Sequence, residues 1–228
     1  MKVLGVLGGM GPAATLDFLA KLQAATPAAR DQDHIRVLMD LNPQVPDRNV
    51  EGGAAGPVLA QMAVRLREAG AEVLAMPCNT AHLHAEEIRT ASALPLLDLI
   101  DIAIAAAGDA RRIGVLGTRL ALDIYRDRLL VAGRDPVLPT EDAQSAFMDI
   151  LYRIKSGETG PTARALMAAC AGGLEQRGAE AVIAGCTEVP LVLSAADLAV
   201  PLIDGSAELA KACVEACRPA SGIHQLDE

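Results

Sequence analysis

The chain has 228 residues, a net charge of −9 at pH 7, and 51% hydrophobic but only 2% aromatic residues. That length can bury a substantial core, either in one large α/β domain or in two small lobes. The acidic charge disfavours a nucleic-acid backbone as a partner, and the scarcity of aromatic side chains argues against a surface on which bases stack.

The first half of the sequence alternates apolar runs with segments of helical periodicity. The apolar runs predict buried parallel strands at residues 2–8, 35–41, 71–75 and 96–98. The periodic segments predict helices at residues 13–22, 56–70 and 79–89, and an alanine-rich helix that ends at 107. Residues 42–48 predict a rigid polar loop, because their prolines can neither continue a helix nor pair in a sheet.

The second half repeats this alternation after a polar turn at residues 108–111. Its strands are expected at residues 112–117, near 137–138, at 180–185 and at 200–203. Its helices are expected at residues 119–131, 142–155 and 206–217. A further helix is expected to start at the break at residues 156–161 and to end at about residue 176. Strands that alternate with helices predict a mostly parallel sheet with helices on both faces.

The two halves also resemble each other, so the chain is predicted to contain two copies of one α/β unit. Residues 2–8 match residues 112–117, and the segment around Cys78 matches the segment around Cys186 in the same order. We therefore expect an α/β fold of two pseudosymmetric lobes with the active site in the cleft between them. The expected divisions are a first lobe at 1–108, onto which the helix 206–217 can pack back, a second lobe at 109–205, and a tail at 218–228.

Cys78 and Cys186 are the candidate catalytic residues, because each follows the apolar run of a predicted strand. Open α/β sheets place their chemistry at the C-terminal ends of the strands, so the two thiols are expected to face each other. To invert a carbon that bears an acidic hydrogen, one group removes a proton from one face and another delivers a proton to the opposite face. Helices expected to begin at Asn79 and Thr187 would lower each thiol pKa from its usual ~8.5, and their free amides would hold a carboxylate.

The cysteines also have simpler interpretations. A single cysteine at a strand end is more often a packing residue than a catalytic one, and only the paired placement favours catalysis. A disulfide or redox pair is disfavoured because neither site is a C-x-x-C motif, and five unclustered cysteines are typical of free thiols in a reducing compartment. The other three, Cys170, Cys213 and Cys217, are expected to be core or surface residues of helices.

Three motifs, at residues 8–12, 77–82 and 185–188, carry a resemblance to a known family. They resemble the signatures of the aspartate/glutamate racemase family, and most closely those of its cofactor-independent aspartate racemases. The resemblance extends over nearly the whole chain. It implies racemisation of aspartate, or of glutamate, without pyridoxal phosphate or another cofactor, with Cys78 and Cys186 as the acid/base pair and a homodimer as the assembly.

The resemblance also implies roles for the residues around the cysteines. Those expected to bind the α-carboxylate or to form a wall of the cleft are Met10, Asn79, Thr80, Thr118 and Thr187. Arg48 resembles the family arginine that meets the side-chain carboxylate, which a guanidinium can bind in bidentate fashion. Lys155 is either a second cationic contact or a solvated lysine at a helix C-terminus. Glu188 either orients a neighbouring side chain or caps a helix.

Other functions remain open at this level. A hydantoin racemase or a maleate isomerase is the rival within the same superfamily, although Arg48 favours an acidic amino acid over a hydantoin. A nucleotide-binding module is a rival from another class, because residues 9–14 fit a G-x-G-x-x-A fingerprint. Against it, Asp40 lies farther along the chain than the fingerprint requires, and Pro12 removes an amide from the anion-binding turn. A non-catalytic sensor of small acids would have no reason to keep two thiols.

Neither a metal site nor a membrane segment is expected. His82 and His84 would point to different faces of a helix without a third ligand, and His82 either tunes Cys78 or is a satisfied helix residue. The apolar run at residues 93–107 is interrupted by Asp98 and Asp101 and is too short to span a bilayer. Since no targeting segment is evident, a cytoplasmic location is the default expectation.

Overall fold

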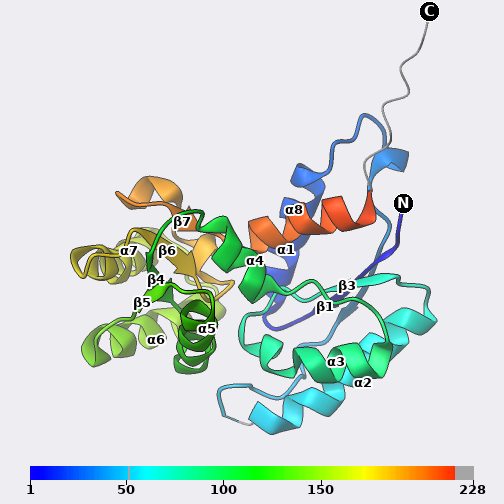
Figure 1. Cartoon of the computed structure of the whole chain (residues 1–228), viewed down its shortest axis with the longest axis horizontal. Coiled ribbons are helices and arrows are strands. Elements are labelled where there is room, and N and C mark those ends of the chain that lie inside the picture. Colours follow the sequence, from blue (N-terminus) through cyan, green and yellow to red (C-terminus); the bar gives the residue numbers. More distant parts are fainter. Residues whose placement is uncertain (51, 219–228) are drawn as a thin grey trace, which may run out of the picture.

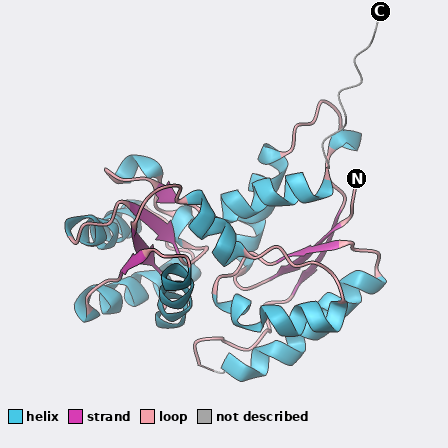
Figure 2. Cartoon of the chain, in the orientation of Figure 1, coloured by secondary structure: helices cyan, strands magenta, loops and turns pink. Residues whose placement is uncertain are grey.

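The computed structural model describes residues 1–50 and 52–218, which form two parallel β-sheets, each flanked by helices (Figures 1 and 2). The first lobe is built on the sheet with strand order β2-β1-β3. Its elements are β1 (Leu4–Gly8), α1 (Pro12–Ala25), β2 (Val37–Leu41), α2 (Ala55–Glu68), β3 (Val73–Ala75) and α3 (Ala85–Ser92). The strand β1 pairs in parallel with both of its neighbours.

The second lobe is built on a four-stranded sheet with order β5-β4-β6-β7, and all of its pairs are parallel. Its elements are β4 (Arg112–Leu116), α5 (Arg119–Val131), β5 (Asp135–Val137), α6 (Glu141–Lys155), α7 (Pro161–Gln176), β6 (Ala181–Ala184) and β7 (Leu202–Ile203). Two further helices, α4 (Leu99–Ala106) and α8 (Gly205–Cys217), pack against each other, and α8 also packs against α1. The predicted α/β fold class with two parallel sheets is confirmed.

Several helices begin at a residue whose chemistry satisfies free backbone donors. The Asp98 carboxylate accepts hydrogen bonds from the first amides of α4, and Asp204 does the same for α8. Thr118 caps α5 through its hydroxyl, at the point where the chain leaves β4. Pro12 opens α1, where its missing N–H costs nothing because that position has no intrahelical partner.

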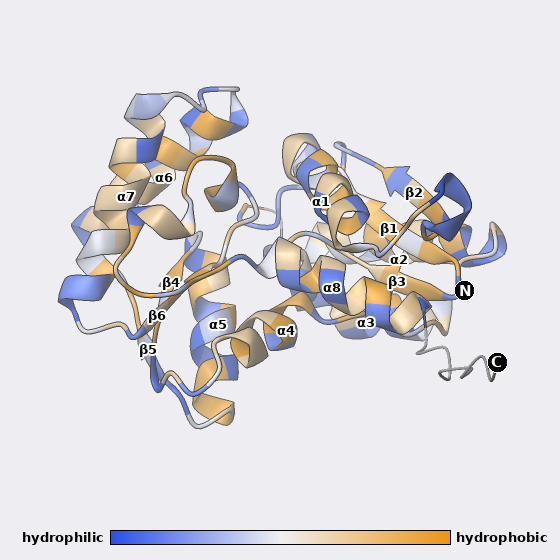
Figure 3. Ribbon diagram, turned by 90° about the horizontal axis from the view of Figure 1, so that it is seen from above, coloured by the Kyte–Doolittle hydropathy of each residue, from blue (hydrophilic) through white to orange (hydrophobic). Residues whose placement is uncertain are grey.

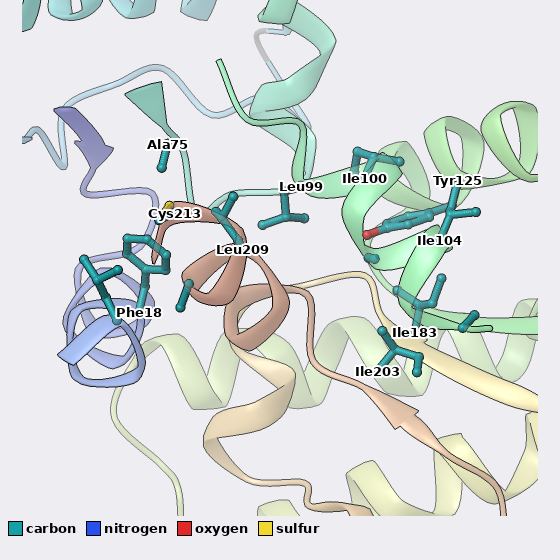
Figure 4. Packing of buried hydrophobic residues seen from close by; sticks show 14 of the residues in the cluster. Phe18, Ala75, Leu99, Ile100, Ile104, Tyr125, Ile183, Ile203, Leu209 and Cys213 are labelled. Atoms are coloured by element: carbon teal, nitrogen blue, oxygen red, sulfur yellow. The ribbon is translucent and has the colours of Figure 1, made fainter. Parts of the chain in front are cut away.

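One continuous apolar core lies between the two sheets, which explains why the lobes pack against each other. It joins residues of β1 and β3 to residues of β4 and β6 through the buried sides of α1, α4, α5 and α8. Figure 4 shows the central members of this core, with Phe18 and Cys213 at the first lobe and Tyr125 and Ile183 at the second. The outer face of each sheet has its own core, covered by α2 and α3 in the first lobe and by α6 and α7 in the second.

The apolar composition is concentrated on the strands and on the sides of the helices that face them. The hydropathy colouring in Figure 3 shows β1, β3 and α4 as largely hydrophobic, while the hydrophilic residues lie mainly on the outward-facing sides of the helices and in the loops. Every residue of β1 is buried, as a strand in the middle of a covered parallel sheet requires. No helix in the described ranges is long and apolar enough to cross a membrane.

Three sequence predictions about the elements are wrong. The helix expected at residues 79–89 is a 3-10 helix (Thr80–His84) followed by α3, and the helix expected after Cys186 is only a short 3-10 helix (Val189–Leu191). The strand expected at residues 96–98 is a single bridge between Leu96 and Leu74. The remaining 3-10 helices are Asp31–Asp33, Gly52–Ala54 and Ala195–Asp197. Most of the expected tail, residues 219–228, lies outside the described residues.

Candidate active site

The two candidate cysteines occupy matching places in the two sheets and line one pocket. Cys78 lies just beyond the C-terminal end of β3, and Cys186 just beyond the C-terminal end of β6. The pocket has a volume of about 300 Å³. Its lining residues are Met10, Arg48, Asn49, Cys78, Asn79, Thr80, Thr118, Lys155, Gly185, Cys186, Thr187 and Glu188. The structure thus brings all ten residues selected from the sequence to one place, together with Asn49 and Gly185, which were not selected.

A second pocket of about 640 Å³ adjoins the first and shares part of its wall. Both are lined by Met10, Arg48, Asn49, Thr118 and Lys155. The second pocket extends along α6, where Met148 and the half-exposed Tyr152 line it. The narrow space beside the thiols therefore continues into a wider one, with Arg48 and Lys155 at the junction.

Cys186 belongs to a hydrogen-bonded chain with an acid and a base. Its Sγ donates to Oε2 of Glu188 at 2.9 Å, and Oε1 of the same buried carboxylate accepts from Nζ of Lys155 at 2.5 Å. Burial, and then the negative charge of Glu188, raises the pKa of the Cys186 thiol well above its usual value. Burial lowers the pKa of Lys155, but the negative charge of Glu188 and its hydrogen bond with the lysine act in the opposite sense, and the pKa of Lys155 is raised. Cys186 is therefore held as a protonated thiol beside an ion pair.

This finding corrects the expectation that a helix N-terminus lowers the pKa of Cys186. No α-helix begins directly after this residue. The next element is the short 3-10 helix Val189–Leu191. The dominant local charge is instead the carboxylate two residues later in the chain, and its sign opposes ionisation of the thiol. The positive end of a helix, which would stabilise a thiolate, is thus absent at this position. The negative carboxylate of Glu188 lies there instead and stabilises the protonated thiol.

Cys78 has different surroundings from Cys186. It is buried, and its Sγ lies 3.7 Å from Oγ1 of Thr80. Within the described ranges no carboxylate lies at hydrogen-bonding distance from this sulfur. The two thiols therefore differ in the groups that hold them, although they lie at equivalent strand ends.

His82 is a structural residue in this fold rather than a partner of the Cys78 thiol. Its Nδ1 lies 2.8 Å from the carbonyl oxygen of Cys78, and its Nε2 accepts from the amide of Leu99 at 3.1 Å. Since an amide can only donate, Nε2 carries no proton and Nδ1 donates to the carbonyl. Burial lowers the pKa of His82, which favours this neutral form. The ring thus ties the loop after β3 to the start of α4.

Asn79 and Arg48 bring unused hydrogen-bond donors to the site. Oδ1 of Asn79 accepts from the hydroxyl of Tyr125 at 2.8 Å, while its buried Nδ2 has no partner among the described residues. One guanidinium nitrogen of Arg48 donates to the carbonyl of Pro46 at 3.0 Å, and its buried Nε has no described partner. Unpaired buried donors are uncommon, and here they lie in the walls of the pocket that holds the thiols.

Tyr125 lies behind the pocket wall, in contact with Asn79, and the sequence did not single it out. A tyrosine at helical spacing is most simply a core residue, and the side chain is indeed fully buried. Its contact with Asn79 joins residues that are 46 positions apart, so no local pattern could reveal it. The described residues contain no group of three or more His, Cys, Asp or Glu side chains that could hold a metal ion.

Comparison with known proteins places this site in a family. Residues 7–213 match the Asp/Glu/Hydantoin racemase family. The broad specificity amino-acid racemase RacX of Bacillus subtilis (strain 168) is 30% identical over 221 residues, which cover 93% of this chain and 96% of RacX. The aspartate racemase of Picrophilus torridus has a similar structure, with a TM-score of 0.84, 28% identity, and coverage of 95% of this chain and 94% of that one.

A more distant structure shares the fold alone. The glutamate racemase of Francisella tularensis subsp. tularensis SCHU S4, solved in complex with D-glutamate, has a TM-score of 0.72 at 18% identity. The matched region covers 94% of this chain and 80% of the glutamate racemase chain. The family match extends over nine-tenths of the chain and includes both cysteine motifs. This chain therefore belongs to the Asp/Glu/hydantoin racemase family and is an isomerase.

Proposed function

We propose that the protein interconverts L- and D-aspartate by two-base proton transfer between Cys78 and Cys186. One observation carries this proposal: two thiols from equivalent strand ends in different lobes line a single pocket that also contains an arginine and unpaired donors. A racemase needs an acid/base group on each face of the α-carbon, and two lobes that contribute one thiol each meet that need. The resemblance to a named aspartate racemase supports the choice of substrate.

The reaction uses the two thiols in opposite protonation states. In one direction the Cys78 thiolate takes the α-hydrogen, so that the C–H bond breaks and an S–H bond forms. The Cys186 thiol then delivers its own proton to the opposite face of the carbanion. In the reverse direction Cys186 must first lose its proton, and the Glu188 carboxylate that already accepts its hydrogen bond is the group positioned to take it. Asn79, Thr80, Thr118 and Thr187 hold the α-carboxylate in the ground state and in the transition state.

Arg48 selects a substrate with a second carboxylate. Lys155 is already paired with Glu188, whereas Arg48 makes no ion pair within the described residues. The guanidinium lies at the junction of the two pockets, where a side-chain carboxylate would reach it. Glutamate is the second candidate, since one methylene changes selectivity by only ~1–3 kcal/mol. The broad specificity named for the B. subtilis relative makes other amino acids worth including.

The alternatives fit the site less well. A hydantoin or another neutral ring would leave the charge of Arg48 unpaired in a partly buried position. A nucleotide would need an acidic residue for its ribose, but Asp40 is paired with Arg65 at 2.8 Å. A sensor of small acids would use Arg48 and Asn79 but would not need a thiol held in a hydrogen-bonded chain.

The experiment follows the chirality of each candidate substrate. Purified enzyme freed of pyridoxal phosphate would be incubated with L-aspartate, L-glutamate and L-lysine under reducing conditions, and both enantiomers quantified by chiral chromatography. We expect D-aspartate to form fastest, and the variant Arg48→Ala to raise the KM for aspartate by about 10- to 100-fold, the loss of a charge-assisted hydrogen bond worth ~1.5–3 kcal/mol. Arg67→Ala, on the surface of α2, is the matched control. Racemisation of lysine in preference to aspartate would contradict the assignment of Arg48.

A further inference from the structure

Tyr125 connects the second lobe to the residue that follows Cys78. It lies on α5 with no exposed surface, and its hydroxyl donates to Oδ1 of Asn79 at 2.8 Å. The ring packs in the core between the sheets, where Figure 4 shows it close to Ile100 and Ile104 of α4. Burial raises the pKa of Tyr125, so the hydroxyl stays protonated and can donate throughout the working range of pH. The contact therefore has a fixed direction, from tyrosine to amide oxygen.

The other end of the Asn79 amide is unused. Asn79 is only 3% exposed and lines the pocket that contains both thiols, and its Nδ2 has no partner among the described residues. An amide has one oxygen that accepts and one nitrogen that donates, so fixing the oxygen also fixes the nitrogen. A buried donor without a partner, in the wall of a pocket, indicates a ligand with an acceptor such as a carboxylate.

We propose that Tyr125 is a positioning residue for substrate binding: its hydroxyl holds the Asn79 amide in the orientation that presents Nδ2 to the substrate carboxylate. The inference rests on the proposed function, because it takes the carboxylate of an amino acid as the ligand. It goes beyond that function by giving a role to a residue outside the pocket. Without the hydroxyl, the amide can turn over and present its oxygen, which repels a carboxylate.

The helix that carries Tyr125 is well placed for this role because it is fixed at two further points. Its first turn is capped by Thr118, which itself lines the pocket. One turn after Tyr125, Arg128 pairs with Asp98 at 3.0 Å, and Asp98 caps α4. The tyrosine hydroxyl is thus held in place by contacts on both sides of it along the helix. A rigid support of this kind restricts the amide that it contacts.

The test is a double-mutant cycle on the binding of aspartate. Tyr125→Phe keeps the ring and removes only the hydroxyl, so the core remains filled. Affinity would be measured as the calorimetric Kd and as the KM, in the wild type and in an Asn79→Ala background. We expect Tyr125→Phe to raise both constants about three- to tenfold, with kcat changed less, because the carboxylate is bound in the ground state and the transition state alike. In the Asn79→Ala background the same substitution should change neither constant.

A matched control separates positioning from stability. Ser92 is also fully buried, and its hydroxyl donates to the carbonyl of Ile88 at 2.7 Å on α3. Ser92→Ala therefore removes a buried hydroxyl that has no part in the pocket, and it should lower the melting temperature without changing the Kd for aspartate. Melting curves of all the variants show whether each one is folded under the conditions of the assay.

Two outcomes overturn the inference, and they can be told apart from a failure of the proposed function. An unchanged Kd in Tyr125→Phe, or an equal proportional change with and without the Asn79 side chain, means that Tyr125 does not act through Asn79. In either case a wild type that still racemises aspartate leaves the proposed function intact. If the wild type binds and racemises no acidic amino acid, the proposed function and this inference fall together.

Discussion

At the scale of single residues, the two thiols of the site are chemically unequal. Glu188 accepts a hydrogen bond from Cys186 and at the same time pairs with Lys155, whereas the described contact of the Cys78 sulfur is the hydroxyl of Thr80. Two equivalent strand ends thus carry thiols in unequal surroundings. Lys155 pairs with this buried carboxylate and compensates its charge.

Replacing Glu188 tests the origin of this asymmetry. The pKa of Cys186 is raised first by burial and second by the negative charge of Glu188, while Lys155 acts in the opposite sense. Glu188→Gln removes the negative charge and leaves the lysine, so the pKa of Cys186 should fall, while burial still holds it above that of an exposed thiol. The rate at which iodoacetamide alkylates Cys186, followed by mass spectrometry across a pH series, reports this shift.

The control for that measurement is Glu141→Gln, because Glu141 is an exposed carboxylate that pairs with Arg119 and does not line the pocket of the thiols. It should leave the alkylation profile of Cys186 unchanged. An unchanged or raised pKa in Glu188→Gln would show that burial alone sets the state of Cys186.

At the scale of elements, the sequence predicted the repeated strand-helix units well and the turns after the cysteines poorly. Buried parallel strands such as β1 and β4 are apolar at nearly every position, which is a strong local signal. The composition of the segment after Cys186 favours a helix, but Pro190 and the cap at Ser194 divide the segment into two short 3-10 helices. Its conformation depends on packing in the second lobe, so helical spacing alone was misleading.

The candidate site was predictable to the extent that it follows from strand ends. Cys78 and Cys186 could be selected because parallel strands bring their C-terminal ends to one edge of a sheet, while their neighbours were selected from the resemblance to the racemase family. The contacts among these residues could not be predicted, since the Lys155–Glu188 pair spans 33 positions and the Tyr125–Asn79 contact spans 46. Such contacts come from tertiary packing, and a single sequence carries no local trace of them.

The start of α4 yields a prediction about stability. Asp98 accepts hydrogen bonds from two amides of α4 and pairs with Arg89 and Arg128, which come from different lobes. Asp98→Asn keeps an acceptor for the amides but removes the charge, and we expect a loss of roughly 1 kcal/mol in the free energy of unfolding. Asp98→Ala also removes the cap and should lose roughly 1 kcal/mol more. Urea unfolding of both variants gives these values, and equal losses would mean that the cap contributes nothing.

At the scale of the whole molecule, two lobes share one core and keep their polar site at the edge of that core. The apolar side chains of α4, α5 and α8 fill the space between the sheets, so the relative position of the lobes is set by burial rather than by a flexible link. The buried thiols are part of this packing, since Cys213 and Cys217 have no exposed surface. Their ionisation couples the stability of the whole chain to pH.

Stability should therefore fall in alkaline solution. Burial raises the pKa of Cys170, Cys186, Cys213 and Cys217 in the folded chain, while unfolded thiols ionise near ~8.5. Between those values the unfolded chain has released protons that the folded chain retains, so each group lowers the stability by up to ~1.4 kcal/mol per pH unit. Urea unfolding under reducing conditions near neutral pH and at about pH 10 measures the slope. Cys213→Ala should reduce it, and a stability that is constant with pH would contradict the prediction.

The most direct test of the two-thiol mechanism is where deuterium goes when L-aspartate reacts in deuterated water. If Cys78 and Cys186 act on opposite faces, the proton taken from one face stays on one thiol while the other, already exchanged with solvent, supplies deuterium. Early in the reaction, after chiral separation and mass spectrometry, the D-aspartate formed should carry deuterium at its α-carbon and the recovered L-aspartate should retain hydrogen. Deuterium that enters the recovered L-aspartate as fast as the product would show that a single group serves both faces, and the two-thiol mechanism would be wrong.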